Sequence, residues 1–395
     1  MAFLRNIMRN IPLQLFMCLL FALFFGAKIT HEFAEYAFTA SNLLKDLLMH
    51  FLPLLVFSYI AVALGAFHSR GFLLVIFVIV CTCLSNALTV FYGYAVGSYA
   101  LPFLITPLKN SDLLNTTVKT VRSLWQLPLR PFIPTDKTML VGAIVGLSLG
   151  LCPIKSILNV IFKLRQFSTT VFKKCFIPLL PIYVLGFLLK IAKEDALWPL
   201  VQRYTGVFVF TCVMLFIYLF LMYVIASQGK IKVMCSYLKE MLPAGITGVS
   251  TVSSAATMPI TIAATERNTG DANYADFCIP ATVNVHLIGD GVSISITALA
   301  LMLMHGSDIP SISTYALFVF FYCLAKFSCA GVPGGGVLVL IPVFQQNLGM
   351  SPEVAGLLAS IYVLQDPILT SANVMGNGAF AIITHKIAKK VKLIT

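Results

Sequence analysis

Two short stretches of small residues, SSAATMP at 253–259 and GVPGGG at 331–336, interrupt apolar segments in the C-terminal half of the chain. Serine and glycine favour helix ends, because glycine weakens a helix and serine hydrogen-bonds to the backbone nearby. In a bilayer, a segment that breaks its helix and turns back is tolerated only where protein or a water-filled cavity surrounds the turn. We therefore expect both stretches to lie at protected helix breaks.

The composition of the chain is that of an integral membrane protein. Of its 395 residues, 59% are hydrophobic and 11% are charged, whereas about a quarter of the residues of a soluble domain are charged. Uncharged runs such as 71–108 and 204–229 exceed the roughly 20 apolar residues that cross a bilayer. We therefore expect a polytopic bundle of helices.

The basic residues are explained better by membrane topology than by nucleic-acid binding. Lysine and arginine number 27 against 15 acidic residues, and they cluster between apolar runs, as the positive-inside rule describes. The clusters at Arg5/Arg9 and 386–392 predict cytoplasmic N- and C-termini, and the sparse loops suggest a bacterial inner membrane. The apolar run after Arg9 resembles a signal peptide, but its length favours a retained helix. The ten cysteines form no CxxC pair, so we expect neither a metal cluster nor disulfides.

Apolar runs predict six membrane spans in the first 230 residues. The stretch 99–137 contains five prolines and is typical of broken helix and external loop. The basic, amphipathic stretch 155–174 predicts a helix on the membrane surface. The six predicted spans lie at 11–28, 47–67, 72–97, 138–153, 167–191 and 205–227.

The C-terminal part repeats one plan twice. An interrupted segment at 233–266 is followed by a polar connector and an apolar run at 277–305, and the same order recurs at 313–348 and 352–385. Interrupted segments in corresponding positions of two repeats indicate the binding site of a secondary transporter near the bilayer midplane. We expect the two interruptions to face each other across a substrate.

The two full helices of this repeat share a polar motif. One reads NVHLIGDG at 284–291, and the other reads NVMGNG at 373–378. Asparagine and paired glycines are costly inside an apolar helix. We therefore expect both helices to unwind at this motif.

The order and spacing of these elements resemble the glutamate transporter family, the dicarboxylate/amino acid:cation symporters. SSAATMPIT resembles the serine-rich tip of that family's first hairpin, GVPGGG the glycine-rich tip of its second, and NVMGNG the NVxGD element of its last helix. The resemblance covers about 230–385. It implies an all-α integral membrane fold of eight transmembrane helices plus two re-entrant hairpins with inverted repeats, and a homotrimer that works by an elevator mechanism.

The same resemblance divides the chain into two parts. Residues 1–230 mainly form the scaffold and the trimer contact, although the helices near 72–97 and 205–227 join the mobile part. Residues 231–395 form the transport core. Its elements are hairpin 1 at 233–266, helix 7 at 277–305, hairpin 2 at 313–348 and helix 8 at 352–385.

The substrate-binding residues that the resemblance implies lie at both tips and on the last helix. Asp366 falls at the acid that holds a substrate amino group in the family, and Thr370 and Asn373 share its helix face. An ionisable residue at that depth is functional by default, whereas serine and threonine in membrane helices often bond only to their own backbone. The full set is Ser253, Ser254, Thr257, Val332, Pro333, Gly334, Asp366, Thr370 and Asn373.

Two departures from the family favour a substrate with a neutral side chain. Leu369 stands where acidic amino-acid transporters carry an arginine, and Val252 stands where some relatives carry one before the serines. A buried substrate carboxylate without a partner is strongly disfavoured. We predict a neutral or zwitterionic amino acid, with a sodium-coupled dicarboxylate or acidic amino acid as the alternative.

The residues that couple transport to an ion also depart from the family. His286 and Asn377 replace two acids whose oxygens suit sodium. On a regular helix, His286 and Asp290 face the same way and would form a proton relay. If a shifted helix puts Asp290 in place of the lost acid, sodium coupling survives. We favour protons over sodium, with a weak sodium site near Asn284, Asn373 and Asn377 as the alternative.

Lys326 is a third departure. It is the only charged residue between Asp308 and Glu353, and it lies shortly before GVPGGG. Its ammonium either occupies the place of a metal cation or extends along its apolar stem to the membrane surface. Apart from the coupling ion, we expect no cofactor.

Two other classes of protein compete with a symporter. A channel for anions or small solutes would use a wet pathway lined by Lys326 and His286. An enzyme would use Ser253 or Ser254 as nucleophile, but no HExxH or GxSxG motif is present and no histidine lies nearby in sequence. We therefore predict a secondary active symporter, not an enzyme, with a small-molecule substrate and no nucleic-acid partner.

Overall fold

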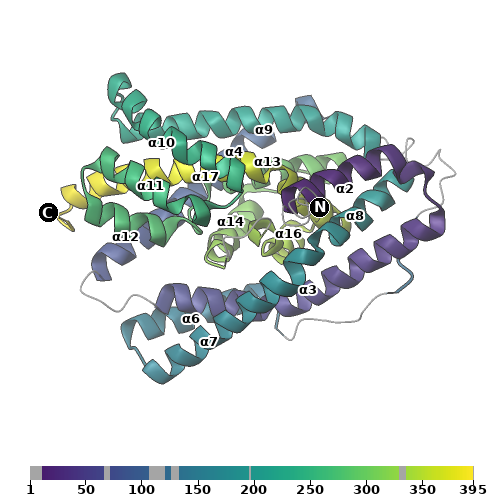
Figure 1. The fold of residues 1–395 in the computed structure, drawn as a ribbon, viewed down its shortest axis with the longest axis horizontal. Coiled ribbons are helices and arrows are strands. Elements are labelled where there is room, and N and C mark those ends of the chain that lie inside the picture. The colour runs from purple at the N-terminus through teal and green to yellow at the C-terminus, as the bar shows by residue number, and fades with distance from the viewer. Residues whose placement is uncertain are drawn as a thin grey trace, which may run out of the picture.

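The structure is a computed structural model that describes residues 11–65, 72–105, 121–125, 133–194, 197–328 and 335–394. Within these ranges the regular structure is helical throughout (Figure 1), as the composition predicts. The elements are α2 (Ile11–Phe25), η1 (Gly26–Lys28), α3 (His31–Gly65), α4 (Phe72–Leu104), α6 (Thr135–Leu151), α7 (Lys155–Val171), η2 (Phe172–Phe176), α8 (Ile177–Lys193), α9 (Leu197–Ala226), α10 (Ile231–Thr251), α11 (Ser254–Thr269), α12 (Ala272–Thr282), α13 (Ile288–Met304), α14 (Ile312–Lys326), α15 (Gly335–Leu338), α16 (Ile341–Leu348) and α17 (Pro352–Lys390).

Four of the described helices are long and apolar enough to cross a bilayer. They lie at His31–Gly65, Leu73–Leu104, Tyr204–Ala226 and Val354–Lys390, and a helix pair bent by 49°, Lys155–Phe176 and Pro181–Lys193, would make a fifth. An 18-residue helix rises about 27 Å, close to the thickness of the hydrocarbon layer. The chain is therefore a helical membrane protein, and the count of eight spans stays a prediction.

Several predicted spans differ from the helices. The predicted spans at 11–28 and 138–153 correspond to α2 and α6, whose 15 and 17 residues are shorter than the others. The span predicted at 47–67 is the second half of α3, a 35-residue helix that begins sixteen residues earlier, at His31. The first half of this helix carries acidic and polar residues, so it does not form an apolar run in the sequence. Most of the predicted loop at 99–137 lies outside the described residues.

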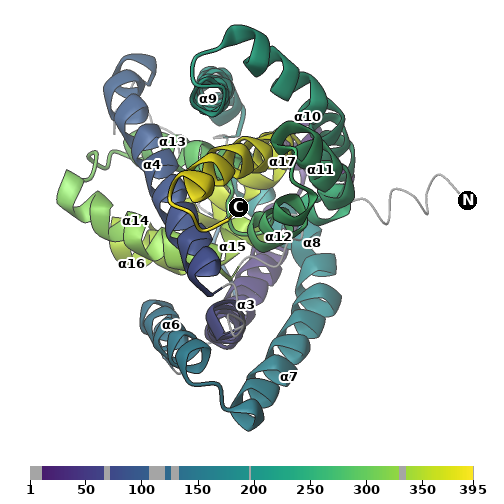
Figure 2. The same cartoon turned by 90° about the vertical axis from the view of Figure 1, so that its left-hand side faces the viewer.

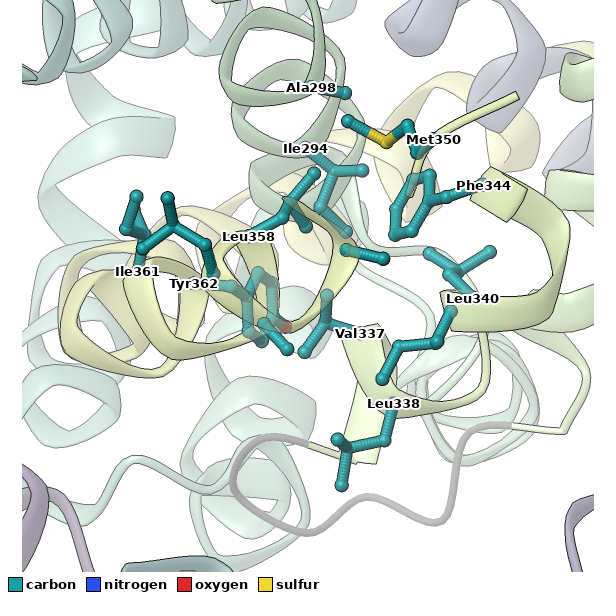
Figure 3. Packing of buried hydrophobic residues seen from close by; sticks show 14 of the residues in the cluster. Ile294, Ala298, Val337, Leu338, Leu340, Phe344, Met350, Leu358, Ile361 and Tyr362 are labelled. Carbon is teal, nitrogen blue, oxygen red and sulfur yellow. The ribbon is translucent and has the colours of Figure 1, made fainter. Parts of the chain in front are cut away.

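The helix α17 lies near the middle of the molecule (Figure 2). It packs against α9, α10, α11 and α13, while α3, α6 and α7 gather at one side (Figure 2). Of the 17 residues of α13, 16 are buried, so this helix and α17 form the core around which the interrupted segments sit. Close up, Ile294 of α13, Phe344 of α16 and Leu358 of α17 point toward one another (Figure 3).

A helix break occurs at the first stretch of small residues, and the described helices end before the second stretch and begin again at its last two glycines. At the first, α10 ends at Thr251, Val252 adopts a left-handed conformation with φ of +50°, and α11 begins at Ser254. The two arms pack against each other. At the second, α14 ends at Lys326 and α15 begins at Gly335, while 329–334 lies outside the described residues. Re-entry of these arms into the bilayer stays a prediction.

The shared polar motif behaves differently in the two full helices. In the first, residues 283–287 separate α12 from α13, which confirms the predicted break. In the second, α17 continues through 373–378 without interruption, so the predicted unwinding is wrong there. The glycines of α17 serve close packing instead: a Cβ on Gly376 would meet the side chain of Ile288, and one on Gly378 would meet that of Met241.

Candidate functional site

A small cavity of about 40 Å³ lies where the first helix break, the α12–α13 break and α17 meet. Most of its described lining residues are polar, and they include Asp290 and Asp366. Seven residues predicted to bind substrate or ions line it together. The full lining is Val252, Ser253, Ser254, Val283, Asn284, Leu287, Asp290, Gly336, Tyr362, Asp366, Thr370 and Asn373.

Asp366 and Thr370 form one side of the cavity on consecutive turns of α17. Asp366 is 5% exposed, and the Thr370 hydroxyl donates a 3.1 Å hydrogen bond to its Oδ1. Opposite charges attract strongly in a buried site. A cavity wall that carries the Asp366 carboxylate is therefore suited to an ammonium group.

The first helix break provides a place for a negative group. The side chain of Ser253 accepts a 3.2 Å hydrogen bond from the backbone N–H of Ala256 and caps α11. The first N–H groups of a helix and its dipole favour a negative group, so the α11 N-terminus at Ser254 is suited to a carboxylate. Thr257 does not line the cavity: it is buried and donates a 3.0 Å hydrogen bond to the Ser253 carbonyl. Its role in substrate binding stays a prediction.

Only the border of the second break belongs to the described site. Gly336, in the short helix α15, lines the cavity. A Cβ at Gly336 would lie 2.9 Å from Asp290 Oδ2 and 3.1 Å from the Tyr362 hydroxyl, so only glycine fits this wall. The predicted residues Val332, Pro333 and Gly334 lie outside the described residues.

A buried ion pair lies directly behind the cavity. The Lys326 ammonium contacts Asp290 Oδ2 at 2.7 Å, and the two side chains are 0% and 1% exposed. The Asn373 amide donates a 2.9 Å hydrogen bond to the other Asp290 oxygen and accepts one of 2.7 Å from the Gly289 N–H. Lys326 therefore does not extend to the membrane surface, which corrects one of its two predicted placements.

His286 does not contact Asp290, because the helix is broken between Val283 and Leu287. Its Nε2 lies 2.8 Å from the Ser85 hydroxyl, and its ring packs on Phe380 with centroids 4.2 Å apart. Asp290 is bonded to Lys326 instead. The predicted relay required a regular helix, and the break places the two side chains on different partners.

The broken segment is held by α4, which the sequence did not single out. The Asn86 amide donates to the Val285 carbonyl at 2.9 Å and accepts from the Leu287 N–H at 3.3 Å. A helix break buried in the bilayer must satisfy its freed backbone groups, and Asn86 satisfies two of them. Adjacent polar residues, Ser85 and Asn86, inside an otherwise apolar run were the available signal.

The three asparagines of the predicted weak sodium site use their amides differently, and the site stays a prediction. Asn373 already uses both ends of its amide, and Asn377 donates to the Asn373 carbonyl at 2.9 Å. Asn284 Oδ1 is buried and has no hydrogen-bond partner among the described residues, and its side chain lies between the cavity and a larger pocket of about 230 Å³. Within the described ranges, no three histidine, cysteine or acidic side chains gather as a metal site.

Comparison with known proteins identifies the family. The profile of the "Sodium:dicarboxylate symporter family" matches residues 11–387. Excitatory amino acid transporter 2 of Homo sapiens is 28% identical over 157 residues, 39% of this chain and 27% of that protein. Serine/threonine transporter SstT of Acinetobacter baumannii is 33% identical over 141 residues, 34% of each chain.

An uncharacterized symporter of Haemophilus influenzae is 32% identical over 157 residues, 39% of this chain and 35% of that protein. The chain thus aligns with about a quarter to a third of the length of these curated relatives. The family is one of symporters, not of enzymes. The resemblance seen in the helix-break motifs is confirmed: the chain belongs to the sodium:dicarboxylate symporter family.

Proposed function

We propose that this protein is a secondary active transporter of a small neutral amino acid. The observation that carries the proposal is the charge of the cavity. Asp366 offers a buried carboxylate on one wall, the α11 N-terminus faces it, and none of the described lining residues is basic. A zwitterion places its ammonium at Asp366 and its carboxylate at the backbone N–H groups near Ser254, so both charges are compensated.

The same cavity disfavours a second carboxylate on the substrate. Residues 327–350 contain no basic residue, so the second helix break brings none. Lys326 is the nearby ammonium, but Asp290 already neutralises it. An acidic side chain would enter a small, buried space without a partner, which is costly. The size of the cavity likewise favours a small side chain. A relative named as a serine/threonine transporter supports this assignment by analogy.

Proton coupling stays our proposal, although without the predicted His286–Asp290 relay. His286 is fully buried beside the broken segment, with the Ser85 hydroxyl 2.8 Å from its Nε2 and the Asn377 side chain as a second neighbour. Val283, Asn284 and Leu287 of the same segment line the cavity, so a proton on His286 would act on the site through a shared piece of backbone. Sodium, as named in the family description, is the alternative.

The larger architecture is proposed from the family. We propose eight spans with two re-entrant hairpins, a scaffold in residues 1–230, a transport core in residues 231–395, a homotrimer and an elevator motion. The break between α10 and α11, and the end of α14 shortly before the second small-residue stretch, support the hairpins. A bacterial inner membrane with cytoplasmic termini follows from the basic clusters.

Uptake by purified protein in liposomes tests the proposed function. Labelled serine, alanine, aspartate and succinate are each offered under a pH gradient and, separately, under a sodium gradient. We expect saturable uptake of serine or alanine driven by pH, with counterflow against unlabelled substrate. Uptake of aspartate or succinate under sodium would overturn the proposed substrate and ion. Conduction that neither saturates nor shows counterflow would indicate a channel.

A further inference from the structure

The environment of the Lys326 ammonium is that of a cation site. Its partners are the Asp290 carboxylate at 2.7 Å and the face of the Tyr322 ring, whose centroid lies 4.9 Å away. Lys326 occupies the last turn of α14 and Asp290 the first turn of α13. The negative end of one helix dipole therefore faces the ammonium, and the positive end of the other faces the carboxylate.

The carboxylate of Asp290 is positioned by neighbours that do not depend on Lys326. Asn373 donates to its Oδ1 from α17 and is itself held by the Gly289 N–H. Gly336 leaves room beside its Oδ2: a Cβ there would lie 2.9 Å from that oxygen and 3.6 Å from the Lys326 Nζ. The Tyr362 hydroxyl borders the same space, 3.1 Å from the position of that Cβ. One hard oxygen, Asp290 Oδ2, is thus held at the place that the ammonium fills.

We propose that Lys326 is a built-in cation. Its ammonium permanently occupies a monovalent cation site at the Asp290 carboxylate, so that no dissolved metal ion is bound at this place. The charge balance supports this: Asp290 is buried and needs one positive charge, and the chain supplies it from α14. Only the meaning of the site for transport rests on the proposed function; the cation site itself is a property of the folded protein.

The inference predicts what happens when the ammonium is removed. Lys326→Met keeps the length of the apolar stem and leaves the Asp290 carboxylate without its cation. A buried carboxylate alone is strongly unfavourable, so the emptied site should recruit a small cation from solution. The stability of the wild-type protein should not depend on which cation is present in solution. The stability of the variant should depend on it.

Thermal unfolding of the purified protein in detergent tests this without any substrate. The unfolding midpoint is followed in lithium, sodium, potassium and choline chloride at one ionic strength. For the wild type we expect the same midpoint in all four salts. For Lys326→Met we expect a lower midpoint in choline and a saturable rise with one of the metal cations, because a ligand that binds only the folded state stabilises it.

Two further variants make the result specific. Lys326→Met combined with Asp290→Asn removes both charges and should lose the cation dependence. Lys386→Met is the matched control, since its ammonium donates to the Ala226 carbonyl and pairs with no carboxylate among the described residues. It should behave like the wild type in every salt.

Three outcomes would overturn the inference. One is a saturable, metal-specific rise in the wild-type midpoint, and another is a folded Lys326→Met protein that ignores all cations. The third is a Lys326→Met protein that folds in none of the salts while the double variant folds. Because these measurements need no transport, a failure of amino-acid uptake leaves the cation site unaffected, and the reverse holds too.

Discussion

The two full helices of the C-terminal repeat carry nearly the same polar motif and use it in opposite ways. Between α12 and α13 the chain unwinds at 283–287, and Asn86 of α4 takes over two backbone hydrogen bonds. In α17 the helix continues, and its Asn377 bonds one turn back to the Asn373 carbonyl. The motif therefore permits a break, and the neighbouring helix decides whether one forms.

The broken segment and the continuous helix contribute different groups to the site. The broken segment brings backbone and Asn284 to the cavity wall, whereas the continuous helix brings a fixed row of side chains, Asp366, Thr370 and Asn373. A regular helix sets the spacing of such a row by its own geometry. We therefore expect changes on α17 to affect substrate binding most, and changes at the break to affect stability.

The largest expected effect is on the continuous helix. Asp366→Asn keeps the shape of the side chain but removes the charge that faces the ammonium, so we expect uptake to fall on the order of 100-fold or more. The unfolding midpoint should stay near the wild-type value. Asp308→Asn, at an exposed position before α14, is the control. Normal uptake by Asp366→Asn would contradict the assignment of Asp366 to the substrate ammonium.

The second largest effect is expected from a substitution that removes the support of the broken segment. Asn86→Ala leaves the Val285 carbonyl and the Leu287 N–H buried without their partner. An unsatisfied buried group costs about 1–3 kcal/mol, so we expect the unfolding free energy to fall by about 2–4 kcal/mol. Unfolding in detergent measures it, with Ser98→Ala on the exposed face of α4 as control. Equal stabilities of the two variants would mean that Asn86 does not hold the break.

The third effect attacks the packing that keeps α17 continuous. Gly376→Ala places a methyl group against Ile288, whose Cγ1 would be 2.6 Å away, and overpacking of this kind costs about 1–3 kcal/mol. Ile288→Ala in the same chain should recover part of the loss. Gly206→Ala on α9, with open space around it, should instead stabilise by about 0.5–1 kcal/mol. The comparison fails if both glycines respond alike.

The smallest effect concerns the start of α12, the helix that leads into the break. Asp271 accepts a 3.0 Å hydrogen bond from the Tyr274 N–H and caps this helix. Asp271→Ala should cost about 1 kcal/mol and leave uptake unchanged, by unfolding and transport assays on the same preparation. A transport defect from this variant would show that the cap, and not only Asn86, sets the geometry of the break.

The pH dependence of this contribution has a definite sign. The hydrogen bond from the Tyr274 N–H, and more weakly the contact with His385, hold the pKa of Asp271 below its ordinary value. The folded state thus favours the ionised carboxylate. Its stabilising effect is complete above about pH 4, near the unfolded pKa, and is lost as the pH falls through the lowered value.

The sequence was sufficient where the information is local. Small residues located the break between α10 and α11, and the spacing of Asp366 and Thr370 correctly placed them on one helix face. It was insufficient where partners come from distant segments. Asn86 lies 199 residues from Val285, and Lys326 lies 36 residues from Asp290 on another helix. A glycine that weakens a helix and a glycine that allows close packing of a neighbouring helix cannot be distinguished in the sequence. The unwinding of α17 was predicted wrongly for this reason.

The Lys326–Asp290 pair also has a consequence for how the sequence can evolve. Losing one partner leaves a lone buried charge, which costs about 3–5 kcal/mol, while losing both together is close to neutral. Under the proposal above, the two positions are not equivalent. Loss of Asp290 alone leaves the Lys326 ammonium buried without a partner, whereas loss of Lys326 alone leaves a carboxylate that a metal cation can neutralise. Across homologous chains we therefore expect Asp290 without Lys326 where a metal cation binds, but not Lys326 without Asp290.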